Sequence, residues 1–227
     1  MGDRLKIWYY TELKKLYALN WQEKIEYIWN YYKLWIIGIV CFLSLTVFLI
    51  VRISANVEGF WLNGSFANTT ARAGSGSQLW EDFEAYGQFD LKEKRLEFDD
   101  QVYFDYLKNQ ARGNNYYNAF VSLTDAGILD FIVMAPDSLS ALAQSGRLTD
   151  LRLEQTKALL ERYADRLIYF QSETDGAIPV GIDLSDSLLV TKYRVYSPEE
   201  GCALGVCAHT GNLDNISLFL QFVLEEG

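Results

Sequence analysis

The stretch LWIIGIVCFLSLTVFLIV, residues 34–51, decides how this chain is organised, because it carries no charge and is dominated by large apolar side chains. Lys33 and Arg52 bracket it. A helix of about 18 residues, rising 1.5 Å at each, approaches the roughly 30 Å hydrocarbon layer of a bilayer. Aromatic side chains cluster at its start, as they do at a membrane–water interface: Trp29, Tyr31, Tyr32 and Trp35. The stretch predicts one membrane-spanning helix.

Two other interpretations of this stretch are weaker. A buried core helix seldom runs this long without a charge. A cleaved signal peptide has a shorter apolar region nearer the N-terminus and small residues at its cleavage site, where this chain has Val51-Arg52-Ile53.

The basic residues around the span predict its orientation. Six precede it: Arg4, Lys6, Lys14, Lys15, Lys24 and Lys33. Arg52 and Arg72 are the only basic residues between the span and Lys92. Positive charge accumulates on the cytoplasmic side. We therefore expect a single-pass protein of the cell membrane, with residues 1–33 in the cytoplasm and residues 53–227 outside the cell.

The part of the chain beyond the span is strongly acidic. It contains 13 basic and 26 acidic residues, a balance of −13. Such a charge repels nucleic acid and anionic lipid, so we expect no nucleic-acid partner. The whole chain is 50% apolar and 15% aromatic, which is typical of a folded protein. About 170 outer residues are enough for one domain with its own core.

Residues 1–33 have the pattern of an amphipathic juxtamembrane helix with interspersed basic residues. Asn20 and Glu23 match a capping box, which predicts the start of a helix that continues into the span. This segment either steadies the anchor or docks on a larger membrane partner.

The first outer segment, residues 52–82, is expected to be a strand followed by a polar tether. Residues 57–66 alternate partly, and residues 67–78 (ANTTARAGSGSQ) are small and polar. The α/β domain is then expected to occupy residues 83–227. Residues 83–89 and 96–98, separated by charged residues, suggest a hairpin. Residues 101–111 have a helical pattern, which Asp99 and Asp100 would cap.

From Tyr116 onward, helices and strands alternate, which favours an α/β domain. The helix that begins there ends at Gly127, and the short apolar run after it indicates a strand buried on both faces. Pro136 and Gly146 mark the start and end of the next helix. The remaining expected elements are a helix at 153–163, strands at 167–170, 178–182 and 203–208, and a closing helix at 212–224.

The three cysteines and the single histidine do not form a familiar reactive motif. Cys41 lies within the span, and Cys202 and Cys207 lie outside, where a disulfide is chemically allowed. GCALGVCA also matches a buried strand, which would hold the two α-carbons about 16 Å apart, beyond the roughly 7 Å limit for a bridge. Cys207 and His209 could form a nucleophile pair, although a structural turn is the simpler interpretation. We expect no metal site, no cofactor and no enzymatic activity.

Asp183 and Asp186, with Ser185 and Ser187, form the best polar cluster in the sequence. Side chains of these types cap helices. They also line ligand crevices, which lie at the carboxyl ends of strands in open α/β sheets.

Three segments resemble parts of bacterial extracellular solute-binding proteins of the type II periplasmic class. They are AGILDFIVMAPDSLSALAQSGRLTDL (126–151), IPVGIDLSDS (178–187) and ALGVCAHTGNLDNISLFLQFVL (203–224). Those proteins close two α/β lobes on a ligand, whereas about 170 outer residues supply one lobe. The resemblance therefore implies the fold of a lobe without clamshell closure. The anchored arrangement also looks like that of small membrane proteins of Firmicutes.

The resemblance also implies a function and a site. We expect a non-catalytic accessory subunit of an ABC-type transport system, with the lipid bilayer, a transporter permease or other membrane protein, and a small-molecule ligand as partners. A membrane sensor or a structural scaffold of a membrane complex is the alternative. Ligand would bind at strand ends, which here carry Asp130, Asp137, Ser138, Asp183, Ser185, Asp186, Ser187, His209 and Asn212.

Overall fold

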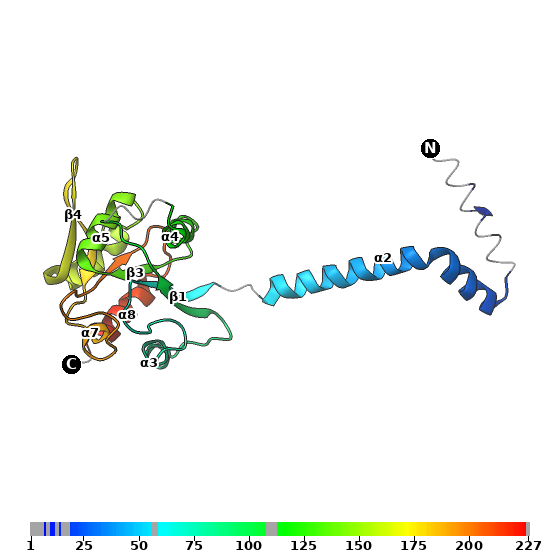
Figure 1. Ribbon diagram of the computed structural model, residues 1–227, viewed down its shortest axis with the longest axis horizontal. Coiled ribbons are helices and arrows are strands. Elements are labelled where there is room, and N and C mark those ends of the chain that lie inside the picture. Colours follow the sequence, from blue (N-terminus) through cyan, green and yellow to red (C-terminus); the bar gives the residue numbers. More distant parts are fainter. Residues whose placement is uncertain are drawn as a thin grey trace. The chain divides into compact units, whose positions relative to one another are not determined.

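The computed structural model describes residues 19–55, 59–107 and 113–225, together with residues 7, 10, 11 and 14. The chain divides into two compact units, Met1–Val57 and Glu58–Gly227, and each is described here by itself (Figure 1). The second unit begins well before residue 83. The segment expected to be a strand and tether in front of the domain therefore contributes to the domain itself.

In the first unit, helix α2 (Trp21–Ala55) runs for 35 residues. One half of the expected capping box forms at its start, the hydrogen bond from the Asn20 backbone to Glu23. The Glu23 carboxylate accepts a hydrogen bond from the Asn20 N–H at 2.9 Å, and Asn20 Oδ1 accepts one from the Trp21 N–H at 3.0 Å. Within α2, Tyr32–Leu49 is long and apolar enough to cross a membrane, judged on length and composition; α2 is the one such helix in the described part of the chain.

All six residues expected at the membrane interface lie on α2. Trp29 and Trp35 expose more than half of their surface within the chain itself. The side chains of Tyr31 and Arg52 lie outside the described residues. The isolated positions before residue 19 do not test the amphipathic helix expected there.

The second unit is built on one mixed, six-stranded sheet, which confirms the α/β class. Its strand order is β2-β1-β3-β6-β5-β4. β1 pairs in parallel with β2 and β3, and the other neighbours are antiparallel. The strands are β1 (Phe60–Ala67), β2 (Arg95–Val102), β3 (Phe131–Met134), β4 (Leu167–Ser172), β5 (Gly176–Asp183) and β6 (Ala203–Val206).

Helices cover both faces of this sheet, and Figure 1 shows α3, α7 and α8 on one side and α4 and α5 on the other. Four-residue β3 is fully buried because alternate side chains enter opposite cores: Phe131 and Val133 one, Ile132 and Met134 the other. The α-helices are α3 (Gln78–Gly87), α4 (Asn115–Asp125), α5 (Pro136–Leu142), α6 (Lys157–Arg162), α7 (Leu188–Thr191) and α8 (Leu213–Glu225). Three short 3₁₀ helices are η1 (Ala143–Ser145), η2 (Glu154–Thr156) and η3 (Ala164–Arg166).

An aromatic cluster fills the core beneath α3 and α8. The rings of Phe131 and Phe219 stack with centroids 4.9 Å apart, and Phe66 and Phe83 pack edge-on around them. Gly64 makes room for this cluster, since a β-carbon there would lie 2.1 Å from the Phe131 ring. Both cores draw all their residues from the second unit, so this unit has the means to fold alone.

The two edges of the sheet differ. Along β2, the Ser75 N–H donates to the Phe98 carbonyl at 2.8 Å, and the Phe98 N–H donates to Ser75 Oγ at 3.0 Å. β2 also carries the exposed charges of Arg95, Glu97 and Asp99. β4 ends the sheet on the other side, and its sequence LIYFQS contains no charge. Ser75, in the loop before α3, therefore covers part of the β2 edge, whereas the β4 edge carries no charged side chain.

The hairpin expected at residues 83–89 and 96–98 is wrong. Residues 83–87 of the first segment lie in α3, which Ser77 caps by accepting a hydrogen bond from the Trp80 N–H at 3.3 Å. The second segment lies in β2, parallel to β1. The helix expected at 101–111 is also wrong over its described part, because β2 continues to Val102 and a turn follows. Residues 108–111 lie outside the described residues.

Asp99 and Asp100 consequently cap no helix. Asp100 is buried within β2, where its carboxylate accepts hydrogen bonds from the Ala73 and Gly74 N–H groups, both at 2.9 Å. Burial acts to raise its pKa, but hydrogen bonds from Gln101, Gly74 and Ala73 outweigh it and lower the pKa below its ordinary value. This carboxylate holds the loop against the sheet.

The elements expected from Tyr116 onward are confirmed, with boundaries that differ by a few residues. Gly146 takes the left-handed conformation expected where a helix ends, with φ 70°. Cys202 and Cys207 are buried free thiols at the two ends of β6, so the strand interpretation holds and the disulfide does not form.

Candidate functional site

The direction of β6 separates the expected site residues into two groups. β6 runs antiparallel to β3, with Phe131 opposite Val206 and Met134 opposite Ala203. The turn after β6, which carries His209 and Asn212, therefore lies beside Asp130 at the amino end of β3. β5 runs antiparallel to β6, with Asp183 opposite Ala203. The groups at 137–138 and 183–187, which follow β3 and β5, thus share the opposite end of the strands.

Asp130 lies at the centre of the first group. Its carboxylate is 1% exposed and accepts hydrogen bonds from the Asn63 N–H at 2.7 Å, from Thr210 Oγ1 at 2.6 Å and from Asn212 Nδ2 at 3.1 Å. Burial raises its pKa above the ordinary value, against the lowering effect of these hydrogen bonds. The carboxylate connects β1, β3 and the turn before α8 by hydrogen bonds, so its contacts indicate a structural role.

His209 belongs to the same turn and is exposed, with a φ of 68°. Gly127 makes room for it, since a β-carbon there would lie 3.2 Å from the His209 carbonyl oxygen. Cys207 is fully buried, and this burial raises the pKa of its thiol well above the ordinary value. A buried, protonated thiol beside an exposed imidazole matches the structural turn and not the nucleophile pair.

In the turn at 183–187, the polar side chains are largely satisfied by one another. Asp183 Oδ1 accepts hydrogen bonds from the Ser185 N–H at 3.0 Å and from Ser185 Oγ at 2.6 Å. Ser187 caps α7 through the Leu189 N–H at 3.3 Å. Asp186 pairs with Arg166, which lowers the pKa of this carboxylate. Ser187 is thus the one helix cap of this cluster, and contacts within the turn and with Arg166 engage the two carboxylates.

A cavity of about 340 Å³ opens at the end of the strands that carries the second group, residues 137–138 and 183–187. It lies where β1, β2 and β3 end, and β1 lies between β2 and β3 in the sheet. The chain leaves β1 toward β2 on one side and leaves its parallel neighbour β3 toward β4 on the other side, so the two connections run in opposite directions. Open α/β sheets bind ligands at such a switch point, beyond the carboxyl ends of the strands. The lining residues are Ala67, Asn68, Tyr103, Phe104, Asp105, Ala135, Ser138, Tyr196 and Glu200.

Of the expected site residues, only Ser138 lines this cavity. Asp137, its exposed neighbour on α5, does not. A wider and shallower groove of about 480 Å³ follows the outer edge of β2, where Arg72, Arg95 and Asp99 are among its lining residues. We take the cavity at the strand ends as the candidate site, because it is more enclosed and lies at the switch point.

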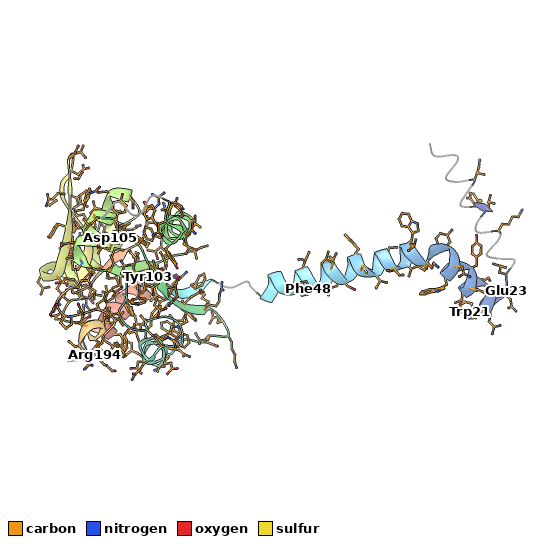
Figure 2. All side chains as sticks on the ribbon, in the orientation of Figure 1. Trp21, Glu23, Phe48, Tyr103, Asp105 and Arg194 are labelled. Carbon is orange, nitrogen blue, oxygen red and sulfur yellow. The ribbon has the colours of Figure 1, made fainter. Side chains whose placement is uncertain are left out.

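The wall after β2 is held by asparagine side chains. Asn68 Nδ2 donates to the Phe104 carbonyl at 2.8 Å, and Asn114 Nδ2 donates to the Tyr103 carbonyl at 3.0 Å. Asn68 has a φ of 56°, a left-handed conformation that asparagine tolerates better than most residues. Tyr103 and Asp105, labelled in Figure 2, therefore lie on a fixed segment.

Tyr196 closes the inner end of the cavity. Its side chain is 2% exposed, and its hydroxyl lies 2.8 Å from the Val133 carbonyl and 3.1 Å from the Ala67 carbonyl, at the ends of β3 and β1. Burial raises the pKa of this phenol well above its ordinary value, so the hydroxyl stays protonated and donates. Tyr196 thus ties together the two strands between which the cavity opens.

Glu200 reaches the rim from a tight turn. The Glu200 N–H donates to Ser197 Oγ at 3.3 Å, and the Gly201 N–H donates to the Ser197 carbonyl at 3.0 Å. Gly201 has a φ of 66°, and a β-carbon there would lie 2.3 Å from Ser185 Oγ. Glycine is therefore required for the turn that presents Glu200.

The lining supplies carboxylate, phenol, amide and hydroxyl groups, which suit binding by hydrogen bonds and charge. Among the residues that the structure describes, no group of three or more histidine, cysteine or acidic side chains is placed to hold a metal ion. The sequence contained a signal for this site that was missed. Residue 68 directly follows β1, and residues 103–105 directly follow β2. Once β2 is recognised as a strand, the rule that ligands bind beyond the carboxyl ends of strands points to these residues.

Comparison of the chain with protein-family models, with curated proteins and with solved structures gives no match. The likeness to solute-binding proteins therefore rests on the quoted sequence segments and stays a prediction.

Proposed function

We propose that this chain is a single-pass membrane protein that presents a non-catalytic binding domain outside the cell. The cavity at the ends of β1, β2 and β3 is the observation that carries the proposal, because its position follows the rule for ligand sites in open α/β sheets. Its volume of about 340 Å³ lies at the lower end of the usual range for small-ligand pockets. The ligand is a small molecule or a single side chain of a larger partner.

Two further features support the proposal. The apolar part of α2 matches the thickness of a bilayer, and the excess of basic residues before it favours a cytoplasmic N-terminus. The chain enters β1 at Phe60, soon after α2 ends at Ala55, and β1 reaches the cavity at Ala67. Within the domain, the cavity thus lies at the end of β1 remote from the point where the anchor joins.

A ligand screen tests the binding function. The full-length protein in a neutral detergent is screened by thermal shift against amines, amino acids, sugars, nucleosides and carboxylic acids. A ligand of this cavity raises the melting temperature of the wild type and of Gln144→Tyr, an exposed control position after α5. It has no effect on Ser138→Tyr, which fills the cavity. A shift that Ser138→Tyr retains places the ligand elsewhere and refutes the site.

As its cellular role, we propose an accessory subunit of an ABC-type transport system. Affinity purification of the full-length protein from its host membrane in mild detergent, followed by mass spectrometry, tests this role. Stoichiometric recovery of a permease or ATPase subunit supports it. Recovery of the protein alone, or with a signalling or scaffold protein instead, refutes the transport role and leaves the binding function to be judged by the screen.

A further inference from the structure

The described charged residues that line the cavity are both acidic. They are Asp105 and Glu200, which approach it from different segments, one after β2 and one from the turn before β6. The remaining described lining consists of aromatic side chains and small or neutral polar ones. This composition disfavours an anionic ligand, because its charge would meet carboxylates.

We propose that the cavity binds an ammonium group, carried either by a free organic amine or by the lysine side chain of a partner polypeptide. The proposal rests on the binding function proposed above and names the chemistry of its ligand. An ammonium group is compact and presents up to three N–H donors, which match carboxylate and hydroxyl acceptors at a small site.

The aromatic lining favours the same ligand. Tyr103, Phe104 and Tyr196 line the cavity from two separate parts of the chain, and the faces of aromatic rings attract cations. Phe104 and Tyr196 are 3% and 2% exposed, so Tyr103 is the accessible ring of the three. Tyr103 keeps 44% of its surface exposed. It packs edge-on against Tyr116, with ring centroids 5.7 Å apart, and Phe104 packs in the same way against Tyr117 at 5.6 Å. These contacts fix the rings before a ligand arrives, which reduces the entropy lost on binding.

The net negative charge of the whole domain also favours a cationic ligand. With 26 acidic and 13 basic residues, the second unit attracts cations and repels anions over a distance of about one Debye length. This long-range field raises the local concentration of an amine. The cavity then selects it by short-range contacts.

Calorimetric titration of the full-length protein in dodecyl maltoside tests the proposal. Three matched probes share the phenethyl group and differ in the group it carries: phenethylammonium, the neutral phenethyl alcohol and the anionic 3-phenylpropionate. The expected result is binding of the cation, with at least about tenfold weaker binding of the other two. The peptide N-acetyl-Gly-Lys-Gly-amide carries its only ammonium group on lysine. It therefore distinguishes a polypeptide source from a free amine.

Matched variants connect the affinity to the cavity. Glu200→Gln removes one carboxylate charge without changing the shape of the side chain, and it is expected to weaken amine binding by about fivefold. Asp105→Asn is expected to have a similar effect. Glu199→Gln makes the same change of net charge at an exposed neighbour outside the lining, so it should change the affinity by less than about twofold.

Each outcome decides the proposal. Amine binding that falls in Glu200→Gln and not in Glu199→Gln supports it, for whichever of the two sources binds. Equal losses in these variants mean general attraction to an acidic surface and overturn it. Preferential binding of the neutral or anionic probe, abolished by Ser138→Tyr, overturns the ammonium chemistry while keeping the binding function. No binding by any probe or by any screened compound, in protein with unchanged near-ultraviolet circular dichroism, overturns both.

Discussion

Replacement of Asp130 is expected to destabilise the second unit strongly, because this carboxylate is buried and serves three donors. Asp130→Ala leaves the Asn63 N–H, the Thr210 hydroxyl and the Asn212 amide without their acceptor. An unsatisfied buried donor costs about 1–3 kcal/mol. Thr210 and Asn212 are half-buried, so water can replace part of the hydrogen bonding that they lose with Asp130. We expect a decrease of about 3–5 kcal/mol in the free energy of unfolding.

Asp130→Asn keeps the shape and one acceptor oxygen, so its expected cost at neutral pH is smaller, about 1–2 kcal/mol. The measurement is urea denaturation of the fragment Glu58–Gly227, followed by the fluorescence of Trp61 and Trp80. Asp137→Ala, which changes an exposed carboxylate, is the control and should shift the free energy by less than about 0.5 kcal/mol.

The pH dependence provides a second test with a defined sign. Because burial raises the pKa of Asp130, the folded state holds its proton more tightly than the unfolded chain does. The stability gained in this way is fully present below the ordinary pKa of 3.8 and is lost as the pH rises through the raised pKa. The deficit of Asp130→Asn relative to wild type should therefore shrink as the pH rises across that window. A deficit that grows instead, or an Asp130→Ala variant as stable as Asp137→Ala, would refute the reasoning.

Three further predictions concern the candidate site and β6. Gly201→Ala should lower the free energy of unfolding by more than about 2 kcal/mol in urea denaturation, because a β-carbon meets Ser185 at a φ of 66°; a loss below 0.5 kcal/mol would contradict the turn. Tyr196→Phe should cost about 1–2 kcal/mol, since two strand-end carbonyls lose their shared donor; unchanged urea midpoints would contradict that role. Cys202, whose pKa burial raises to about 12, and Cys207 should react with Ellman's reagent only after unfolding; rapid reaction in the native fragment, or a missing thiol after unfolding, would contradict their free, buried state.

Sequence patterns predicted the second half of the domain better than the first half, for physical reasons. Pro136 and Gly146 mark the ends of a helix by their backbone chemistry, and a short apolar run such as β3 has few alternatives once both of its faces are covered. The aromatic residues of α3 favoured a strand by propensity, whereas packing against α8 makes them helical. Tertiary contacts therefore determine the helical conformation of that segment.

The candidate site could be predicted only in part. Its position at the carboxyl ends of strands was expected, and Ser138 was correctly placed there. The direction of β6 could not be deduced, because an antiparallel strand has the same apolar pattern as a parallel one. This ambiguity moved His209 and Asn212 to the other end of the strands, where Asp130 lies because it directly precedes β3.

The unequal edges of the sheet limit how copies of this domain can associate. A strand from another chain can add only where backbone donors and acceptors are accessible, and the loop before α3 already occupies positions along β2. β4 remains as the uncharged edge. If two copies joined through β4, each would use its uncharged edge, and the β2 strands, with their charged side chains, would stand at both ends of the combined sheet. Charged side chains on an edge strand oppose further pairing, so edge-to-edge association through β4 would favour a closed pair over a fibre.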